Sequence, residues 1–274
     1  MIIATRQMTR SAGLKIIRWH SIGIQSVRVD VNRYNVYAIG DVHGCNSEMI
    51  ELIEKCLVHC YKEEKFAKIY LLGDLIDRGP DFFEVFLSLQ HTFIECIIGN
   101  HELNFYLERM GKECRSRSRK VSHDKFDALE EQHQDFVMKS IGDMPNAAIV
   151  ELFDDTGDMD MVPFLLSHSP IRNIEYIETD GVYSTLNAPQ CCMRSTEIDM
   201  NALDKTTNGC VLVHGHQSWN FKPVPEQLED QEKYNNKVIN IDSGCVYGEK
   251  LTALCLNSLE VIEVQAKKAY STRH

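Results

Sequence analysis

The sequence predicts an α/β fold whose first half forms parallel β-strands joined by helices. Three short hydrophobic runs, VYAI at 36–39, IYLL at 69–72 and CII at 96–98, are typical of buried strands, and each is followed by glycine and then a polar residue able to bind metal. Right-handed crossovers bring the carboxyl ends of parallel strands to one edge of a sheet. We therefore expect the polar residues after these runs to converge there.

The helices that connect these strands are indicated by the spacing of apolar residues. Residues 46–60 have the periodicity of an amphipathic helix, and a second helix is expected to begin at Pro80, a residue favoured in the first turn. Residues 101–141 are mostly helical in pattern. They are expected to form a cap or insert beside the converging residues.

The second half of the chain predicts a further sheet, because strand-like runs alternate with turn residues. These runs are AAIVELF at 147–153, MVPFLLSH at 161–168, CVLVHGH at 210–216, KVINID at 237–242 and LTALCL at 251–256. Residues 217–236 contain two prolines and many polar residues, and a long surface loop is expected there.

Composition limits the classes of protein that fit. With 274 residues, 43% of them hydrophobic, the chain is long enough for one large domain. The net charge of −11 argues against an extended nucleic-acid surface. No run approaches the roughly 20 apolar residues that span a bilayer. Ten cysteines without a secretory signal indicate reduced thiols and a cytoplasmic location.

We divide the chain into an N-terminal extension (1–33), a catalytic domain (34–265) and a C-terminal tail (266–274). The first 29 residues carry five basic residues and no acidic one, which resembles a transit peptide in composition. An additional N-terminal strand and an upstream start codon are the alternative interpretations.

The residues expected to converge have the chemistry of a two-metal site. Asp74 would lie between two ions, with Asp41 and His43 on one side and Asn100 on the other. Two metal ions about 3.5–4 Å apart can share a hydroxide that acts as the nucleophile. Because Asn100 is neutral, the site would keep an excess of positive charge that attracts a phosphate dianion.

The second half offers three histidines that could complete the metal coordination. His168, His214 and His216 each stand at the end of a strand-like run. One such histidine is more often structural, but three in a chain with these motifs favour metal binding.

Three further residues fit the chemistry of phosphoester hydrolysis. His101 is predicted to be the general acid that protonates the leaving group, and Asp77 to hold it in place. Arg78 is predicted to bind phosphate oxygens, because a guanidinium offers paired donors that match them.

Taken in order, the motifs GDVHG, GDLIDRG, GNHE, HSP and HGH resemble the signature series of the phosphoprotein phosphatase family of calcineurin-like metallophosphoesterases, in its bacterial and bacteriophage branch. The resemblance implies a β-sandwich of two mixed sheets flanked by helices. It implies one metal ion on Asp41, His43 and Asp74, and another on Asp74, Asn100, His168 and His216. His216 is preferred to His214. For the second phosphate-binding arginine we chose Arg194, with Arg172 as the alternative.

This resemblance predicts a metal-dependent phosphatase of phosphoserine and phosphothreonine, with phosphotyrosine as a further substrate. The partner would then be a phosphorylated protein or peptide; the oligomeric state is not indicated. The alternative is a dinucleoside polyphosphate hydrolase, because the segment GCVYG at 244–248 resembles the closing segment of such enzymes. Asp77 and Glu102 favour the protein phosphatase over this alternative. A nucleotide or RNA-end phosphatase is a third possibility. Two divalent ions are expected, Mn²⁺ first, with Fe, Zn²⁺ and Ni²⁺ as alternatives.

Overall fold

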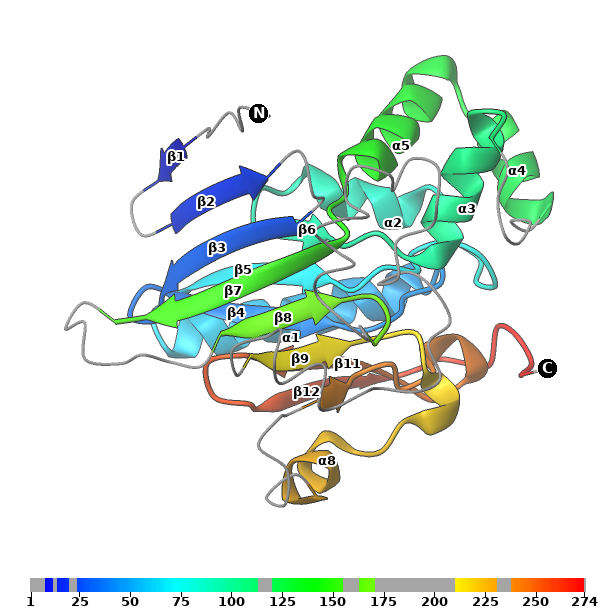
Figure 1. The fold of residues 1–274 in the computed structure, drawn as a ribbon. Helices are drawn as coiled ribbons and strands as arrows, with labels where there is room; N and C mark the ends of the chain where they lie inside the picture. Colours follow the sequence, from blue (N-terminus) through cyan, green and yellow to red (C-terminus); the bar gives the residue numbers. More distant parts are fainter. Residues whose placement is uncertain are drawn as a thin grey trace.

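The computed structural model has two β-sheets packed face to face, with helices outside them (Figure 1). It describes residues 8–11, 14–19, 24–112, 120–154, 163–170, 210–230 and 238–273, of which 8–19 and 228–230 are described by their backbone alone. The mixed sheets and flanking helices confirm the predicted fold class.

The smaller sheet has the strand order β12-β11-β4-β5-β6 and contains the predicted βαβαβ unit. Its parallel strands are β4 (Tyr34–Ile39), β5 (Phe66–Leu71) and β6 (Ile94–Cys96). Helix α1 (Asn46–Lys62) joins the first two. Strands β11 (Lys250–Cys255) and β12 (Val261–Gln265) add an antiparallel edge.

The second crossover helix is shorter than the sequence suggests. It is divided into α2 (Glu84–Leu87) and the 3₁₀ turn η1 (Ser88–Gln90). The chain after Pro80 does not enter the helix at once, because the amide of Asp81 donates a hydrogen bond to the Gly44 carbonyl 3.2 Å away. The residues before α2 are thus held in the turn that carries Arg78.

The larger sheet has the order β1-β2-β3-β7-β8-β9-β10. Its strands are β1 (Met8–Ser11), β2 (Leu14–Trp19), β3 (Ile24–Asp30), β7 (Ala147–Phe153), β8 (Phe164–Ser167), β9 (Val211–His214) and β10 (Val238–Asn240). Residues 1–33, treated above as an extension, thus contribute three strands to this sheet. The domain boundaries at 33 and 265 stay predictions.

One hydrophobic core lies between the sheets and another beneath the helices. Val27 and Val150 of the larger sheet share a buried cluster with Val36 and Tyr70 of the smaller one. Burying side chains of this size contributes about 1.5–3 kcal/mol each, so this cluster strongly favours the face-to-face packing. On the other side of the smaller sheet, α1 contributes Met49 to the second core.

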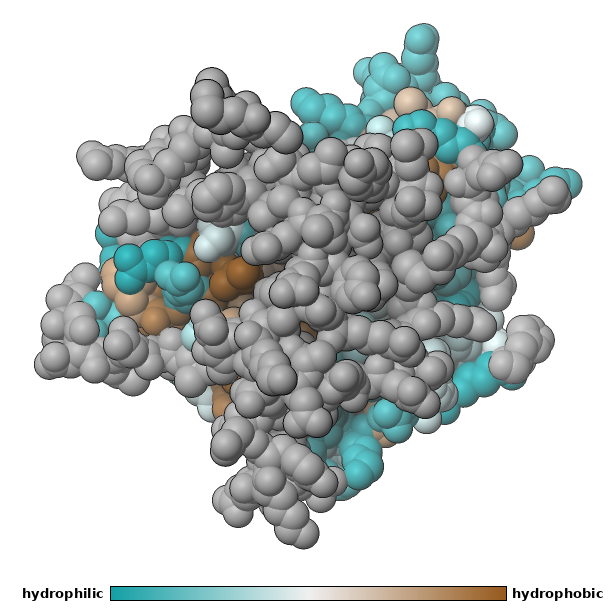
Figure 2. All heavy atoms as spheres, in the orientation of Figure 1, coloured by the Kyte–Doolittle hydropathy of each residue, from teal (hydrophilic) through white to brown (hydrophobic). Residues whose placement is uncertain are grey.

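Three helices stand at the end of the sheets toward which β8 and β9 point (Figure 1). They are α3 (Asn100–Arg109), α4 (Lys120–Asp127) and α5 (Glu131–Asp143), in the range predicted to be mostly helical. Figure 2 shows mainly hydrophilic side chains on the outer surface of α4 and α5. None of the described helices is both long and apolar enough to cross a membrane.

The prediction of a long surface loop at 217–236 is wrong in part, because this range contains the turn η3 (Ser218–Asn220) and helix α8 (Val224–Asp230). The side chain of Gln227 holds this helix against the edge strand β10. Its Oε1 accepts a hydrogen bond from the Asn240 amide at 2.8 Å, and its Nε2 donates to the Asn240 carbonyl at 2.7 Å. The amide group therefore pairs with β10 as a neighbouring strand would.

Candidate active site

Residues that follow the carboxyl ends of the strands in both sheets form one buried cluster. Asp41 and His43 follow β4, Asp74 follows β5, Asn100 follows β6, His168 follows β8, His216 follows β9 and Asp242 follows β10. All but Asn100 and His216 have less than 6% of their surface exposed. The structure thus brings together the residues that the sequence predicts as metal ligands.

Backbone strain is concentrated at this cluster. Of seven non-glycine residues with positive φ in the described part of the chain, five belong to it or adjoin it: His43, Asp74, Asp77, Arg78 and His216. Such conformations cost about 1–3 kcal/mol each and persist only where the surroundings enforce them. Glycines permit the close approach, since a Cβ at Gly215 would overlap Asp41 Oδ1.

Asp74 lies at the centre, and its two carboxylate oxygens face different histidines. Oδ2 lies 3.5 Å from His43 Nε2 and 3.8 Å from His101 Nε2. Oδ1 lies 3.3 Å from His168 Nε2. Burial would raise the pKa of Asp74, but the imidazoles around it, His168 first, outweigh this and lower it. The carboxylate is therefore ionised and placed to bridge two cations.

On one side of Asp74, His43 is held by its backbone neighbours. Its Nδ1 lies 2.9 Å from the Ile76 carbonyl, so Nδ1 carries the hydrogen and Nε2 keeps its lone pair. Nε2 is directed toward Asp41 Oδ2, 4.0 Å away, and contacts the guanidinium of Arg78. The predicted phosphate-binding arginine thus lies against a predicted metal ligand.

On the other side, His168 is the common neighbour of Asn100 and His216. Its Nδ1 donates to the Leu72 carbonyl at 2.7 Å, which leaves Nε2 free to accept. Nε2 lies 3.1 Å from Asn100 Oδ1 and 3.0 Å from His216 Nδ1. His216 Nε2 is buried and has no hydrogen-bond partner in the described part of the chain. A bound cation would satisfy this nitrogen.

These residues fit divalent metal ions. Burial lowers the pKa of His43 and His168, and lowers that of His216 to about 3, so the imidazoles are neutral and can donate lone pairs. Each of two groups, His43 with Asp74 and His101, and Asp74 with His168 and His216, places its ligand atoms within 4.8 Å of one another. Mixed oxygen and imidazole ligands suit Mn²⁺, Fe, Ni²⁺ or Zn²⁺.

His101 lies beside the cluster in a hydrogen-bonded chain. Its Nδ1 contacts Asp77 Oδ2, and the hydroxyl of Ser122 in α4 donates to the other oxygen of Asp77. Burial would lower the pKa of His101, but the charge of Asp74 and the bond to Asp77 outweigh it and raise the pKa. The surroundings therefore favour the protonated form of His101.

The sequence did not single out Asp242 as part of this site. Burial raises its pKa to about 6, and burial together with the Asp242 charge raises the pKa of Asp41 well above its usual range. The signal was available, because Asp242 ends the strand-like run KVINID just as Asp41 follows VYAI. The carboxyl edge of β10 lies beside that of β9.

Other predicted site residues lie apart or outside the described residues. Arg194 and Arg172, the candidates for a second phosphate-binding arginine, are both outside the described residues. His214 Nδ1 lies 2.8 Å from the Gly215 carbonyl, and His214 does not belong to either group of possible metal ligands.

Glu102 holds the backbone of the site and does not face it. Its Oε2 accepts hydrogen bonds from the amides of Asp74 at 2.8 Å and Gly99 at 3.0 Å, and its Oε1 accepts from Ile76 at 3.0 Å. The side chain is fully buried. It therefore fixes the strained loop after β5.

We expect Glu102→Gln to lower the free energy of unfolding by about 1–3 kcal/mol, because an NH₂ group would then face a backbone amide that loses its acceptor. Urea unfolding measures the change. Glu54→Gln, on the exposed face of α1, is the matched control and should change it by less than about 0.5 kcal/mol. Equal stabilities for the two variants would contradict this role of Glu102.

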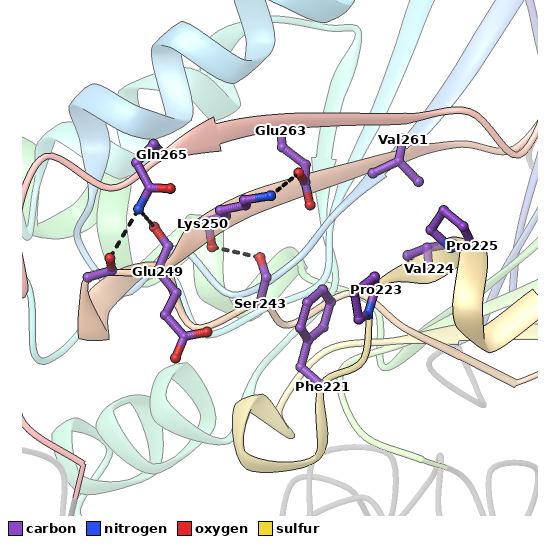
Figure 3. Close-up of a pocket in the computed structure, with 11 residues that line it drawn as sticks. Phe221, Pro223, Val224, Pro225, Ser243, Glu249, Lys250, Val261, Glu263 and Gln265 are labelled. Carbon is purple, nitrogen blue, oxygen red and sulfur yellow. Dashed lines mark hydrogen bonds and ion pairs between the residues drawn. The ribbon is translucent and has the colours of Figure 1, made fainter.

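The cavities lined by described residues include a larger and a smaller one. The larger, of about 520 Å³, lies between β11, β12 and the start of α8 (Figure 3). Its polar groups are paired with one another, Lys250 with Glu263 and Ser243 with the Lys250 carbonyl. The smaller cavity, of about 80 Å³, reaches Asp77 and Arg78. Only the smaller one contacts predicted catalytic residues.

A two-sheet sandwich with carboxylates and histidines gathered at its strand ends defines a metal-dependent phosphoesterase. The model of the calcineurin-like phosphoesterase family matches residues 34–248, so the chain belongs to that family. Membership implies bound divalent metal ions, for which the residues above are candidate ligands.

Relatives extend over most of the chain. The asymmetrical bis(5'-nucleosyl)-tetraphosphatase PrpE of Geobacillus sp. (strain WCH70) is 25% identical over 85% of this chain and 94% of its own length. That of Oceanobacillus iheyensis is 27% identical over 85% and 92%. The symmetrical bis(5'-nucleosyl)-tetraphosphatase of Nitrosospira multiformis is 25% identical over 87% and 98%.

Solved structures show the same fold. A putative diadenosine tetraphosphatase aligns with a TM-score of 0.55 and 17% identity, over 88% of this chain and 97% of the other. A protein serine/threonine phosphatase from Saccharomyces cerevisiae aligns with a TM-score of 0.50 and 11% identity, over 89% and 82%. At identities this low, the similarity shows only that the folds are alike.

The prediction of a phosphorylated protein or peptide as partner is contradicted by these relatives, which are named as hydrolases of nucleotides. The reason lies in the residues used to discriminate. Asp77 contacts His101 and Ser122, and Glu102 binds backbone amides. Asp77 and Glu102 therefore stabilise the centre, and their presence does not distinguish a protein substrate from a nucleotide substrate.

Proposed function

We propose that this chain hydrolyses dinucleoside polyphosphates, with diadenosine tetraphosphate as the representative substrate. The observation that carries the proposal is the similarity to bis(5'-nucleosyl)-tetraphosphatases over almost their whole length. The residues of the centre suit such a substrate, because attack on a phosphoanhydride requires the same electrostatic stabilisation as attack on a monoester.

We propose that one metal ion is held by Asp41, His43 and Asp74. The other would be held by Asp74, Asn100, His168 and His216, and Mn²⁺ is the first candidate for both. When bound, the ions would polarise the reacting phosphate and supply an activated water.

The chain's own residues then bind the phosphate and move a proton. Arg78 binds the oxygens of the reacting phosphate, since its guanidinium offers paired donors. His101, whose protonated form is favoured by the charge of Asp74 and the bond to Asp77, gives its proton to the departing oxygen. Ser122 keeps Asp77 oriented toward His101.

Steady-state hydrolysis of diadenosine tetraphosphate with added Mn²⁺, followed by separation of the products, tests the proposal. Two molecules of ADP would show symmetrical cleavage, and ATP with AMP would show asymmetrical cleavage. A phosphoserine peptide is the comparison substrate. Turnover of the peptide without turnover of the dinucleotide would overturn the proposal.

We expect Ser122→Ala to lower kcat for the dinucleotide roughly tenfold, because a hydrogen bond to a charged group contributes about 1.5–3 kcal/mol and part of it acts in the transition state. The pH profile of kcat should shift as well, since Asp77 would hold His101 less firmly. Ser88→Ala, another buried serine, is the control. If kcat and the pH profile were unchanged, Ser122 would have no role in orienting Asp77 and His101 for proton transfer.

A further inference from the structure

A tryptophan at the edge of the site has no role in the chemistry described so far. Trp219 lies in η3, three residues after His216, and 58% of its surface is exposed. Its ring centre is 5.8 Å from that of His216, with the two planes at 78°. The ring is thus fixed along one edge beside a proposed metal ligand, while much of its surface remains open to a ligand.

Two guanidinium groups, those of Arg78 and Arg273, share the ring of Tyr247. The guanidinium carbon of Arg78 lies 5.7 Å from the centre of the Tyr247 ring, and that of Arg273 lies 5.2 Å from it. Arg273 Nη2 also lies 3.5 Å from the carbonyl of Ser218, the residue before Trp219. Tyr247 and Arg273 therefore connect Arg78, the proposed phosphate-binding arginine, with the backbone just before the exposed Trp219.

The charge of Arg273 is available for a ligand. Its partner is Glu249, 2.8 Å away, and the two side chains are 44% and 50% exposed. Exposed ion pairs of this kind contribute only about 0–1 kcal/mol. A phosphate, which accepts two parallel hydrogen bonds from a guanidinium, can therefore displace Glu249 at little cost.

A polyphosphate substrate needs such a second cation. A dinucleoside polyphosphate carries charged phosphates beyond the one that reacts, and the guanidinium of Arg273 can bind them where Arg78 is already engaged with the reacting phosphate. The aromatic surface of Trp219 matches the other part of a nucleotide, because nucleobases stack on exposed aromatic rings.

We propose that Trp219, Tyr247 and Arg273 form a nucleotide subsite, in which Trp219 stacks on one base and Arg273 binds the phosphates between that base and the reacting one. Tyr247 positions Arg273. The inference rests on the proposed function, because it names residues that select a nucleotide.

The subsite is tested by competitive inhibition of p-nitrophenyl phosphate hydrolysis, with ADP and inorganic pyrophosphate as the inhibitors and Mn²⁺ in excess. Trp219→Ala should raise the inhibition constant of ADP about tenfold, since stacking contributes about 1–3 kcal/mol per base. The constant of pyrophosphate, which has no base, should stay within about twofold. Arg273→Gln should raise both constants about tenfold.

Two control variants match the substitutions. Phe66→Ala removes an exposed aromatic ring at the start of β5, the end of the strand away from the site. Arg33→Gln removes an exposed arginine between β3 and β4. Neither should alter the inhibition constants. A second readout is tryptophan fluorescence in a Trp19→Phe background, because the chain has only two tryptophans. ADP should then quench the emission of Trp219.

Failure of the subsite and failure of the proposed function can be distinguished. If ADP inhibits the wild type and Trp219→Ala equally, or does not inhibit the wild type, the subsite is overturned whatever the enzyme hydrolyses. If diadenosine tetraphosphate is not hydrolysed while ADP binding still depends on Trp219, the proposed reaction fails and the nucleotide subsite stands.

Discussion

Asp74→Asn is expected to lower kcat for diadenosine tetraphosphate at least about a thousandfold, because it removes the charge from the carboxylate that faces both histidine groups. Asparagine has nearly the same shape, so the fold should persist. Metal content per chain, measured by mass spectrometry after gel filtration, should fall together with kcat.

Asp135→Asn is the matched control for this variant. Asp135 lies on the exposed side of α5, and its substitution removes the same charge without touching the site. Full activity and full metal content are expected. If Asp74→Asn kept both, the assignment of Asp74 as the residue shared by two ions would be wrong.

His101→Asn should lower kcat by about a hundredfold to ten-thousandfold, the usual contribution of a general acid. The loss should depend on the leaving group, since a poor leaving group needs the proton most. A series of aryl phosphates with leaving groups of increasing pKa measures this. The variant should lose more activity at each step along the series.

The pH profile provides an independent check on His101. Because the structure raises the pKa of His101 and the proposed reaction uses its protonated form, wild-type activity should fall as pH rises through that pKa. This alkaline decline should be absent in His101→Asn. His91→Asn, at an exposed position before β6, should keep the wild-type profile. An unchanged decline in His101→Asn would assign the titration to another group.

The strands that carry the site could be predicted from the sequence because each is a continuous apolar run before a glycine. The elements that were missed have weaker patterns. Strand β12 lies at a sheet edge, and its residues Val261, Ile262 and Glu263 are half-buried, so no clean alternation marks it. Helix α8 has Pro223 just before it and Pro225 in its first turn, and its position depends on the contact between Gln227 and β10.

Local sequence explains the cluster of Asp41, His43 and Asp74 but not its surroundings. Ser122 contacts Asp77 and Arg273 contacts Tyr247 from segments far along the chain, and neither residue has a neighbouring motif. Their roles depend on the packing of α4 and of the residues after β12. Substrate preference is equally hard to predict from local sequence, since one fold can carry sites with different functions.

The pairing of β4 with β11 has a consequence for how the protein is made. Asp41 and His43 follow a strand whose last residue, Ile39, is paired with Ala253. Bringing such distant segments together is slow, and during synthesis it must wait until β11 has been made. We therefore expect a nascent chain in which β11 has not yet been made to have no complete centre and to take up no metal.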